Sequence, residues 1–333
     1  MSKIKKNHEQ KGRIMPLLEV QNLKTYYKIL RGWVKAVDNV TFDVEKGEGL
    51  GLAGESGCGK TTISLSILRI LPSGGRTRGG KILFSGINLL DLSEEEMRDK
   101  IRWKGISIVF QGAMNALNPV YKISDQIMEA IRLHEPEIET QEARRRTEQL
   151  FELVGLDPSR VDNYPHEFSG GMKQRAMIAM ALSCNPSLLI ADEPGTALDV
   201  IVQAQVLKLL RELKEKLNLS MIVVSHDLSI IAEVCERTAI MYAGKVVEFS
   251  DSVGIFGEPL HPYTQGLIKA FPSIHAPKTR MTSIPGAPPD LLNPPTGCRF
   301  HPRCPYAMEI CKKKEPEFFD VGKRHFVACH LVH

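Results

Sequence analysis

Gly54-Glu-Ser-Gly-Cys-Gly-Lys60-Thr61 is the stretch that determines the predicted fold. It matches the pattern G-x-x-x-x-G-K-S/T and follows a short apolar run, Gly49 to Ala53. A strand, a glycine-rich loop and a helix in this order form a phosphate-binding loop. Lys60 can neutralise phosphate oxygens, and Thr61 can place a hydroxyl on Mg²⁺. The residues predicted to contact the nucleotide here are Gly54, Ser56, Gly57, Cys58, Gly59, Lys60, Thr61 and Thr62.

Polar side chains follow three further predicted strands. Asp192 and Glu193 end an apolar run, His226 follows another, and Gln111 comes directly after a third. Because the carboxyl ends of parallel strands meet at one edge of a sheet, we expect these side chains near the loop. Asp192 can reach Mg²⁺, and Glu193 can act on an attacking water. His226 can contact the γ-phosphate, and Gln111 can ligate Mg²⁺ or orient the water.

A second glycine pair stands in Phe168-Ser-Gly-Gly-Met-Lys-Gln-Arg175, at the start of a predicted helix. A helix start exposes unpaired N–H groups and the positive end of a dipole, so Ser169, Gly170 and Gly171 suit an anion.

Tyr27, on a predicted edge strand, can stack on a nucleotide base. The adjacent Tyr26 is the rival position and points to the other face of the strand.

The remaining pattern predicts an α/β fold with additions. Alternating apolar residues predict antiparallel strands at 17–27 and 35–44, and amphipathic segments predict a helical insertion at about 112–182. We predict a disordered leader at 1–14, an ATPase domain at 15–256, and a proline- and cysteine-rich extension with little regular structure at 257–333. Further elements are predicted as strands at 49–53, 80–84, 105–110, 188–191 and 221–224, helices at 62–71, 125–133, 141–154, 172–182 and 200–217, and a hairpin at 238–249.

Composition excludes several classes of protein. The chain has 333 residues, of which 43% are hydrophobic and 25% charged, as in an ordinary globular protein. The net charge of +4 favours no nucleic acid partner. The polar, basic start of the chain is unlike a secretory signal, and no apolar run approaches the length of a membrane span.

Taken together, these motifs resemble those of the ATP-binding subunit of an ABC transporter, over nearly the whole chain from about residue 17. All six motifs of that family occur in its order. They are Gly54–Thr61 as the Walker A loop, Gln111 as the Q-loop, Ser169–Gly171 as the signature, Leu188–Glu193 as Walker B with the catalytic glutamate, Ala197–Asp199 as the D-loop and His226 as the switch histidine. The resemblance implies that Asp199 takes part in the nucleotide site.

Other stretches resemble the oligopeptide/dipeptide importer branch of that family. They are residues 110–121, 261–264, 285–289 and 298–304. Three positions depart from the family pattern. Phe168 replaces a leucine, Gly195 replaces a threonine beside the catalytic glutamate, and Gly112-Ala113 replaces Asp-Pro. The glycine at 195 loosens the backbone next to Glu193, which puts the full rate of hydrolysis in question but not ATP binding.

The resemblance implies a peripheral protein on the cytoplasmic face of the membrane. It implies a second ATPase subunit, identical or paralogous, in a head-to-tail dimer, two transmembrane permease subunits, and an indirect link to an extracytoplasmic solute-binding protein. The solute stays open: short peptides are favoured, with longer peptides, nickel chelates and sugars as alternatives. A soluble ABC ATPase acting on DNA or ribosomes, and a redox-regulated switch protein, are the competing classes.

Four of the seven cysteines crowd the end of the chain, at Cys298, Cys304, Cys311 and Cys329. Short irregular segments often require a metal for stability. Some members of the resembled branch bind a 4Fe–4S cluster with a similar set of cysteines, and four thiolates suit one. Zinc, with His301 and His330 as substitute ligands, and unligated thiols are the alternatives.

Overall fold

The computed structural model describes residues 15–112, 116–270 and 284–332, so the expected leader at 1–14 lies outside the described residues. The first sheet is antiparallel and has the order β2-β1-β4-β5. Its strands are β1 (Leu18–Ile29), β2 (Gly32–Val44), β4 (Gly75–Phe84) and β5 (Ile87–Asn88). Buried and accessible residues alternate along much of β1 and β2, which confirms the two half-buried strands predicted there.

The second sheet contains the strands that end at the predicted polar residues. Its order is β11-β12-β10-β9-β3-β8-β7-β6, and its pairs from β9 to β6 are parallel. Every residue of β3, β7 and β8 is buried, as expected of parallel strands covered on both faces. The strands are β3 (Gly49–Ala53), β6 (Ile106–Val109), β7 (Leu188–Asp192), β8 (Ser220–Ser225), β9 (Arg237–Tyr242), β10 (Lys245–Asp251), β11 (Phe319–Asp320) and β12 (Phe326–Val327).

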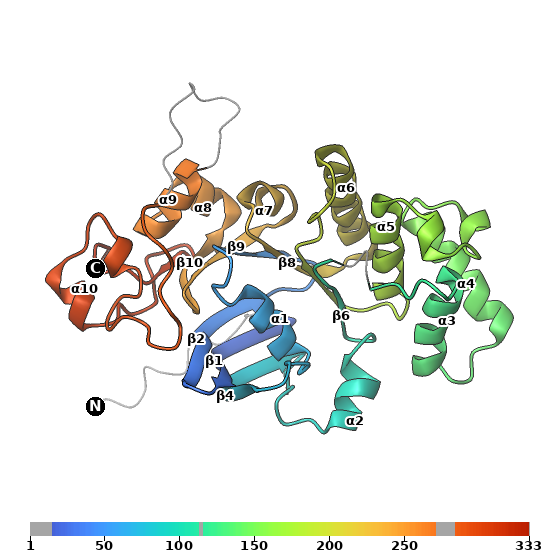
Figure 1. Cartoon of the computed structure of the whole chain (residues 1–333), viewed down its shortest axis with the longest axis horizontal. Coiled ribbons are helices and arrows are strands. Elements are labelled where there is room, and N and C mark those ends of the chain that lie inside the picture. The colour runs from blue at the N-terminus through green and yellow to red at the C-terminus, as the bar shows by residue number, and fades with distance from the viewer. Residues whose placement is uncertain (1–14, 113–115, 271–283, 333) are drawn as a thin grey trace, which may run out of the picture.

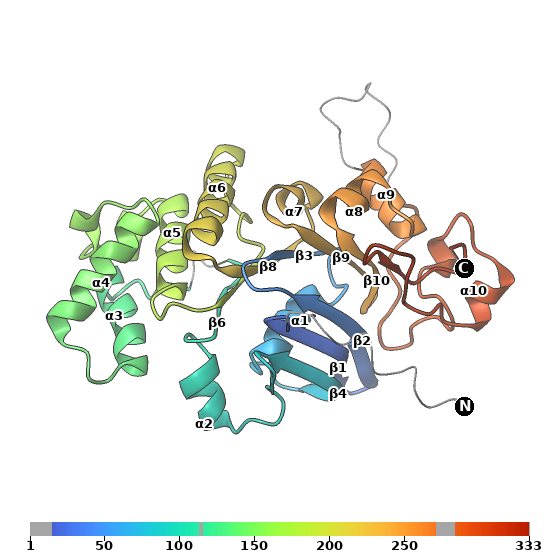
Figure 2. The ribbon, with the colours of Figure 1, turned by 180° about the vertical axis from the view of Figure 1, so that it is seen from behind.

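Two hydrophobic cores lie on opposite faces of this sheet. Leu188 and Ile190 of β7 face the core shared with the antiparallel sheet and helix α1 (Lys60–Ile67). Leu189 and Ala191 face the other core, beneath α6 (Val200–Leu217) and α7 (Leu228–Val234). Figures 1 and 2 show α6 and α7 on one side of the sheet and α1 with the antiparallel strands on the other.

The helical insertion forms one end of the molecule (Figure 1, green). Its helices are α3 (Ile123–His134), α4 (Thr140–Leu153) and α5 (Gly170–Ala181), close to the predicted ranges. Short turns complete this part and the loop before β6. They are α2 (Glu94–Glu96), a π-helical turn (Met97–Ile101) and 3-10 turns at Pro158–Arg160 and Pro165–Glu167.

The C-terminal extension packs onto the main sheet. Strand β12 pairs antiparallel with β10, and the buried side chains of Tyr263 and Phe300 belong to the same core as α6 and α7. Its regular elements are α9 (Pro262–Ala270), a 3-10 turn (His301–Arg303), α10 (Glu309–Lys313), β11 and β12, and α8 (Ser252–Gly257) precedes it. The proline-rich composition indicated irregular chain but did not indicate this packing.

The predicted fold class is confirmed, and the differences are at element ends and in short elements that were not predicted. Helix α1 ends at Ile67, not at residue 71, because Arg69 adopts a left-handed φ of 55°, and Pro72 disfavours helical backbone at residue 71. The short helices α7, α8 and α9 were not predicted. They extend over six to nine residues, too few for a clear helical period in the sequence.

Candidate active site

The phosphate-binding loop connects the end of β3 to the start of α1. Gly59 has a φ of 107°, and a Cβ there would lie 2.1 Å from the Ala36 carbonyl oxygen, so only glycine fits. The Lys60 side chain is buried, and its Nζ donates to the carbonyl oxygens of Gly54 at 2.7 Å and Glu55 at 3.1 Å. Cys58 is buried beneath the loop, and this burial raises the pKa of its thiol.

Asp192, at the end of β7, is 1% exposed, and its two carboxylate oxygens accept no hydrogen bond within the described residues. Burial raises its pKa and the Glu193 carboxylate adds to this, while neighbouring Thr61 and Lys60 act in the opposite direction. A buried carboxylate without a partner, beside a hydroxyl and an ammonium group, fits a bound divalent cation. Asp192, Thr61 and Gln111 are the residues that would hold Mg²⁺, which neutralises charge on the phosphates when bound.

The carboxylate of Glu193 is the centre of a hydrogen-bond cluster. It accepts from Gln111 Nε2 at 2.7 Å and from the Thr196 hydroxyl at 2.9 Å, and it lies 3.0 Å from His226 Nδ1. Burial alone would raise its pKa, but the hydrogen bonds with His226 and Thr196 and the charges of His226 and Lys60 outweigh burial and lower it. The carboxylate is therefore ionised at neutral pH and can accept a proton from water.

Strand order explains why these side chains meet. Gln111, Glu193 and His226 follow β6, β7 and β8, which are neighbours in the sheet. They are thus brought together although they are far apart in the sequence. Thr196 was not expected in this cluster. It lies in the turn after Pro194, and no sequence signal distinguishes it from an ordinary turn residue.

Ser169 and Asp199 each lie at the start of a helix. The Ser169 hydroxyl accepts the Met172 N–H at 3.4 Å as the N-cap of α5, and a carboxylate oxygen of Asp199 accepts the Val202 N–H at 2.9 Å as the N-cap of α6. Helix α5 lies beyond β6 from α1 in both views (Figures 1 and 2). The helix that Ser169 caps is therefore separated from α1, the helix of the phosphate loop, within one chain.

The two tyrosines of β1 have different neighbours. The Tyr27 hydroxyl donates to the Thr62 hydroxyl at 3.4 Å, next to the start of α1. The Tyr26 hydroxyl donates to Asp38 at 2.7 Å, and burial together with this carboxylate raises the pKa of Tyr26 to about 12. Tyr27 is thus the tyrosine on the side of the phosphate loop.

The four C-terminal cysteines are free thiols that lie near one another. Burial, and then the thiols of Cys311, Cys329 and Cys304, raise the pKa of Cys298 to about 11. However, no three His, Cys, Asp or Glu side chains in the described parts of the chain are arranged to hold a metal ion. The geometry therefore does not support the expected 4Fe–4S or zinc site as the side chains stand.

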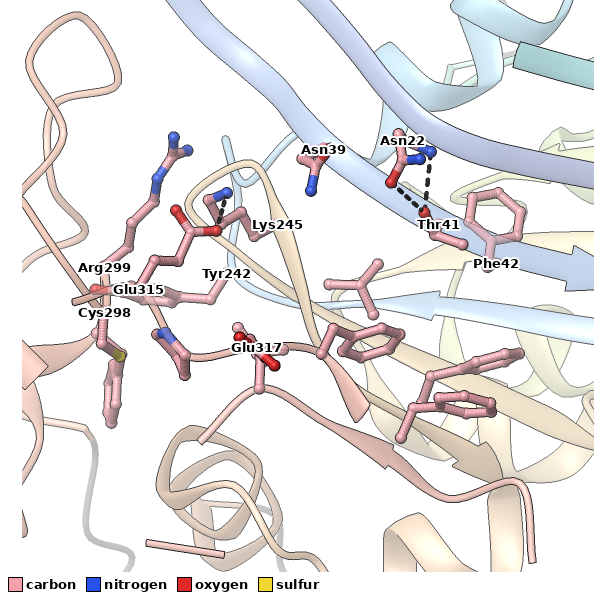
Figure 3. A pocket seen from close by; sticks show the side chains of 18 of the residues that line it. Asn22, Asn39, Thr41, Phe42, Tyr242, Lys245, Cys298, Arg299, Glu315 and Glu317 are labelled. Carbon is pink, nitrogen blue, oxygen red and sulfur yellow. Dashed lines mark hydrogen bonds and ion pairs between the residues drawn. The ribbon is translucent and has the colours of Figure 1, made fainter. Parts of the chain in front are cut away.

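Cys298 also lines a cavity of about 670 Å³ between the antiparallel sheet and the extension. Figure 3 shows its polar side, where Lys245 pairs with Glu315 near Arg299 and Tyr242. No residue of the phosphate loop lines this cavity, so it is distinct from the nucleotide site.

Comparison with known proteins agrees with this geometry. Residues 37–196 match the family model "ABC transporter", and residues 247–311 match "Oligopeptide/dipeptide transporter, C-terminal region". The "Oligopeptide transport ATP-binding protein OppD" of Bacillus subtilis is 46% identical over 96% of this chain and 90% of its own length. The chain belongs to the ATP-binding subunits of ABC transporters, in the oligopeptide/dipeptide family. The "Dipeptide transport ATP-binding protein DppD" of Haemophilus influenzae is also 46% identical, over 95% of this chain and 96% of its own.

Solved structures support the ABC ATPase fold. A dimeric post-hydrolysis state of the ATP-binding cassette MJ0796, bound to ADP and Pi, has a TM-score of 0.63 and 27% identity, and the match covers 71% of this chain and 98% of that one. A structure of cbiO1 from Clostridium perfringens, part of the ABC transporter complex cbiONQ, also has a TM-score of 0.63 and 27% identity, with coverage of 73% and 91%. This ABC ATPase has no helix within its described residues long and apolar enough to cross a membrane.

Proposed function

We propose that this ABC ATPase hydrolyses ATP to drive the import of dipeptides or oligopeptides through a membrane complex. The observation that carries the proposal is the length of the similarity. Relatives named as dipeptide and oligopeptide transport proteins match 95–96% of the chain, including the extension that is specific to this branch. We propose two transmembrane permease subunits and a second ATPase subunit as direct partners at the cytoplasmic face, and an extracytoplasmic solute-binding protein as an indirect one.

In this proposal the residues of the chain have separate roles in ATP binding and hydrolysis. The phosphate loop and Lys60 hold the phosphates, Glu193 accepts a proton from the attacking water, and His226 contacts the γ-phosphate. The start of α5, with Ser169, serves the ATP bound by the partner subunit. The separation of α5 from α1 within one chain supports this division, since a head-to-tail dimer brings the two elements together.

Substitution Glu193→Gln tests the role of the general base. We expect nearly unchanged MgATP binding and a fall in hydrolysis of about 100-fold to 10,000-fold, because the amide cannot accept the proton from water. Calorimetric titration measures the binding, and phosphate release from the assembled transporter measures the rate. A variant that hydrolyses ATP at the original rate contradicts the role of Glu193.

Uptake by cells tests the transported solute. A strain that lacks this subunit should lose uptake of labelled dipeptides and regain it with the original chain but not with Glu193→Gln. Labelled longer peptides and a nickel chelate serve as the competing solutes. Loss of nickel uptake alone, with peptide uptake unchanged, would exclude the peptide assignment and leave the ATPase activity in place.

For the cysteine-rich segment we propose a structural or redox-sensing 4Fe–4S cluster. Its support is the set of four neighbouring free thiols in an irregular segment, although their side chains are not arranged as a metal site. Protein purified without oxygen should be brown and contain about four iron atoms and four sulfides per chain. Colourless protein with one zinc ion per chain, or with no metal, rules the cluster out.

A further inference from the structure

Arg303 of the C-terminal extension forms a two-point ion pair with the phosphate loop. Its Nη1 donates to one carboxylate oxygen of Glu55 at 2.7 Å, and its Nη2 donates to the other at 3.0 Å. The Arg303 side chain is 5% exposed, and that of Glu55 is 27% exposed. Paired, charge-assisted hydrogen bonds of this kind are strong and directional, and the burial of the arginine reduces screening by solvent.

The guanidinium of Arg303 is itself held in place. Its Nε donates to the Pro285 carbonyl at 2.9 Å, and its Nη2 also contacts the Ile284 carbonyl at 3.3 Å. The guanidinium carbon lies 5.6 Å from the centre of the Tyr242 ring, at the end of β9. One segment of the extension, at Ile284 and Pro285, and one strand of the main sheet therefore determine where the guanidinium group lies.

Tyr263 of the extension holds the same loop residue from another direction. Its hydroxyl accepts the backbone N–H of Glu55 at 3.0 Å. The Tyr263 ring is fully buried, with ring centres 4.6 Å from Tyr242 and 5.4 Å from Phe300. Packing on both sides leaves the hydroxyl little freedom, so it places the first peptide group of the loop.

The third polar group of Glu55 contacts the lysine that binds phosphate. Its carbonyl oxygen accepts from Lys60 Nζ at 3.1 Å. The carboxylate, the N–H and the carbonyl of Glu55 thus contact Arg303, Tyr263 and Lys60 in turn. Through this one residue, the extension is connected to the group that neutralises the nucleotide.

We propose that Arg303 and Tyr263 are positioning residues for the nucleotide. They hold the phosphate loop in its binding shape, and Arg303 also neutralises the Glu55 carboxylate, which would otherwise repel an anionic ligand. The extension thereby controls how tightly the ATPase binds nucleotide. This role is independent of the solute that the transporter carries and of any metal held by the cysteines.

Substitution Arg303→Met tests the proposal by MgADP binding to the full chain, measured by calorimetry. Because the loop loses its anchor and the carboxylate is left unpaired, we expect the Kd to rise about tenfold. Arg324→Met is the matched control. This arginine is also in the extension and pairs with Asp43 and Glu45, but it does not contact the loop, so its Kd should not change.

A double-mutant cycle separates positioning from general structural damage. In a Glu55→Gln background the unpaired carboxylate is absent, so the addition of Arg303→Met should change the Kd by less than about twofold. Tyr263→Phe keeps the packed ring, removes only the hydroxyl, and should raise the Kd about threefold to tenfold. Thermal unfolding without nucleotide shows whether each variant is folded.

Two outcomes overturn the proposal. One is a folded Arg303→Met chain with a lowered thermal midpoint and unchanged MgADP affinity. The other is an equal loss of affinity from Arg303→Met with and without Glu55→Gln. If Arg303→Met alone fails to fold, Tyr263→Phe decides, since a folded variant with unchanged Kd refutes the role of the extension.

Discussion

At the scale of the residue, Glu193 shows how a functional group is prepared before nucleotide binds. Its φ of 48° lies in the left-handed region, which a side chain other than glycine adopts at a cost of about 1–3 kcal/mol. Hydrogen bonds with Gln111, Thr196 and His226 hold the carboxylate, and its backbone N–H donates to Val224 at 2.9 Å. The surrounding contacts therefore offset a strained conformation at the residue that we propose as the general base.

The burial of His261 leads to a prediction of how the stability of the protein depends on pH. The side chain is 1% exposed, and burial lowers its pKa from 6.5 to about 3. Its Nδ1 accepts the backbone N–H of Tyr263 at 3.0 Å, and the backbone N–H of His261 donates to the buried Glu248 carboxylate at 3.0 Å. Between pH 6.5 and 3 the unfolded chain binds a proton that the folded chain does not. Above pH 6.5 His261 therefore does not reduce the free energy of unfolding. Below pH 6.5 the free energy of unfolding decreases as the pH falls.

We expect this one histidine to lower the free energy of unfolding by about 1.4 kcal/mol for each pH unit below 6.5. Urea unfolding at pH 7.5 and 5.5 measures the dependence. His261→Gln should reduce the loss between these two values by about 1.4 kcal/mol, whereas His166→Gln, at an exposed position, should leave it unchanged. An identical pH dependence in His261→Gln and the original chain would contradict this prediction.

At the scale of the element, helices α5 and α6 approach closely at Gly171. A Cβ on Gly171 would lie 2.4 Å from Val202 Cγ1, a distance that real contacts do not reach. The second glycine of the signature is therefore required for packing within this chain, in addition to any contact with the partner's ATP.

Gly195 also lies against a side chain of α6. A Cβ there would lie 2.7 Å from Gln203 Cγ, so Gln203 fills the space of the threonine side chain that the family usually has.

Gly171→Ala should destabilise the protein by about 1–3 kcal/mol, because the added methyl group forces α5 and α6 apart. The second substitution Val202→Ala removes the clashing methyl group and should restore most of the loss. Urea unfolding of the single and double variants measures both effects. If Val202→Ala does not rescue stability, the close contact between the helices is not the cause.

At the scale of the whole molecule, Arg237 joins the two sheets. It lies on β9 of the main sheet and pairs with Asp43 on β2 at 2.9 Å and with Glu48 in the turn before β3. The Arg237 side chain is 8% exposed and that of Glu48 is 12% exposed, so removal of the arginine leaves the largely buried Glu48 carboxylate without its ion pair, while Asp43 keeps its pair with Arg324. This contact therefore adds an ion pair to the hydrophobic core that the two sheets share.

Arg237→Met should lower the free energy of unfolding by about 3–5 kcal/mol, measured by urea unfolding at pH 7. Arg98→Met is the control, because the Arg98–Asp99 pair is more than half exposed and should contribute less than about 1 kcal/mol. Equal losses in the two variants would show that Arg237 is no more important than a surface ion pair.

The phosphate loop, the strands that lead to Gln111, Glu193 and His226, and the helical insertion could all be predicted from the amino-acid sequence. Each of these depends on local requirements: glycine where a backbone passes close to another, apolar residues in buried strands, and a polar residue at a strand end. The fold class follows from the order of these segments. Element ends and short helices were less predictable, because a six-residue helix has little period of its own.

The contacts of the extension, in contrast, are visible only in the folded chain. Glu55 and Arg303 are separated by 248 positions, and both were visible in the sequence without an indication that they meet. The irregular segment from 284 to 304 has no repeating pattern from which its path can be predicted. Its position follows from the burial of Tyr263 and Phe300 against Tyr242, which brings the arginine to the phosphate loop. Pairs of this kind depend on packing across the whole chain, and the sequence near either residue does not indicate that the two will meet.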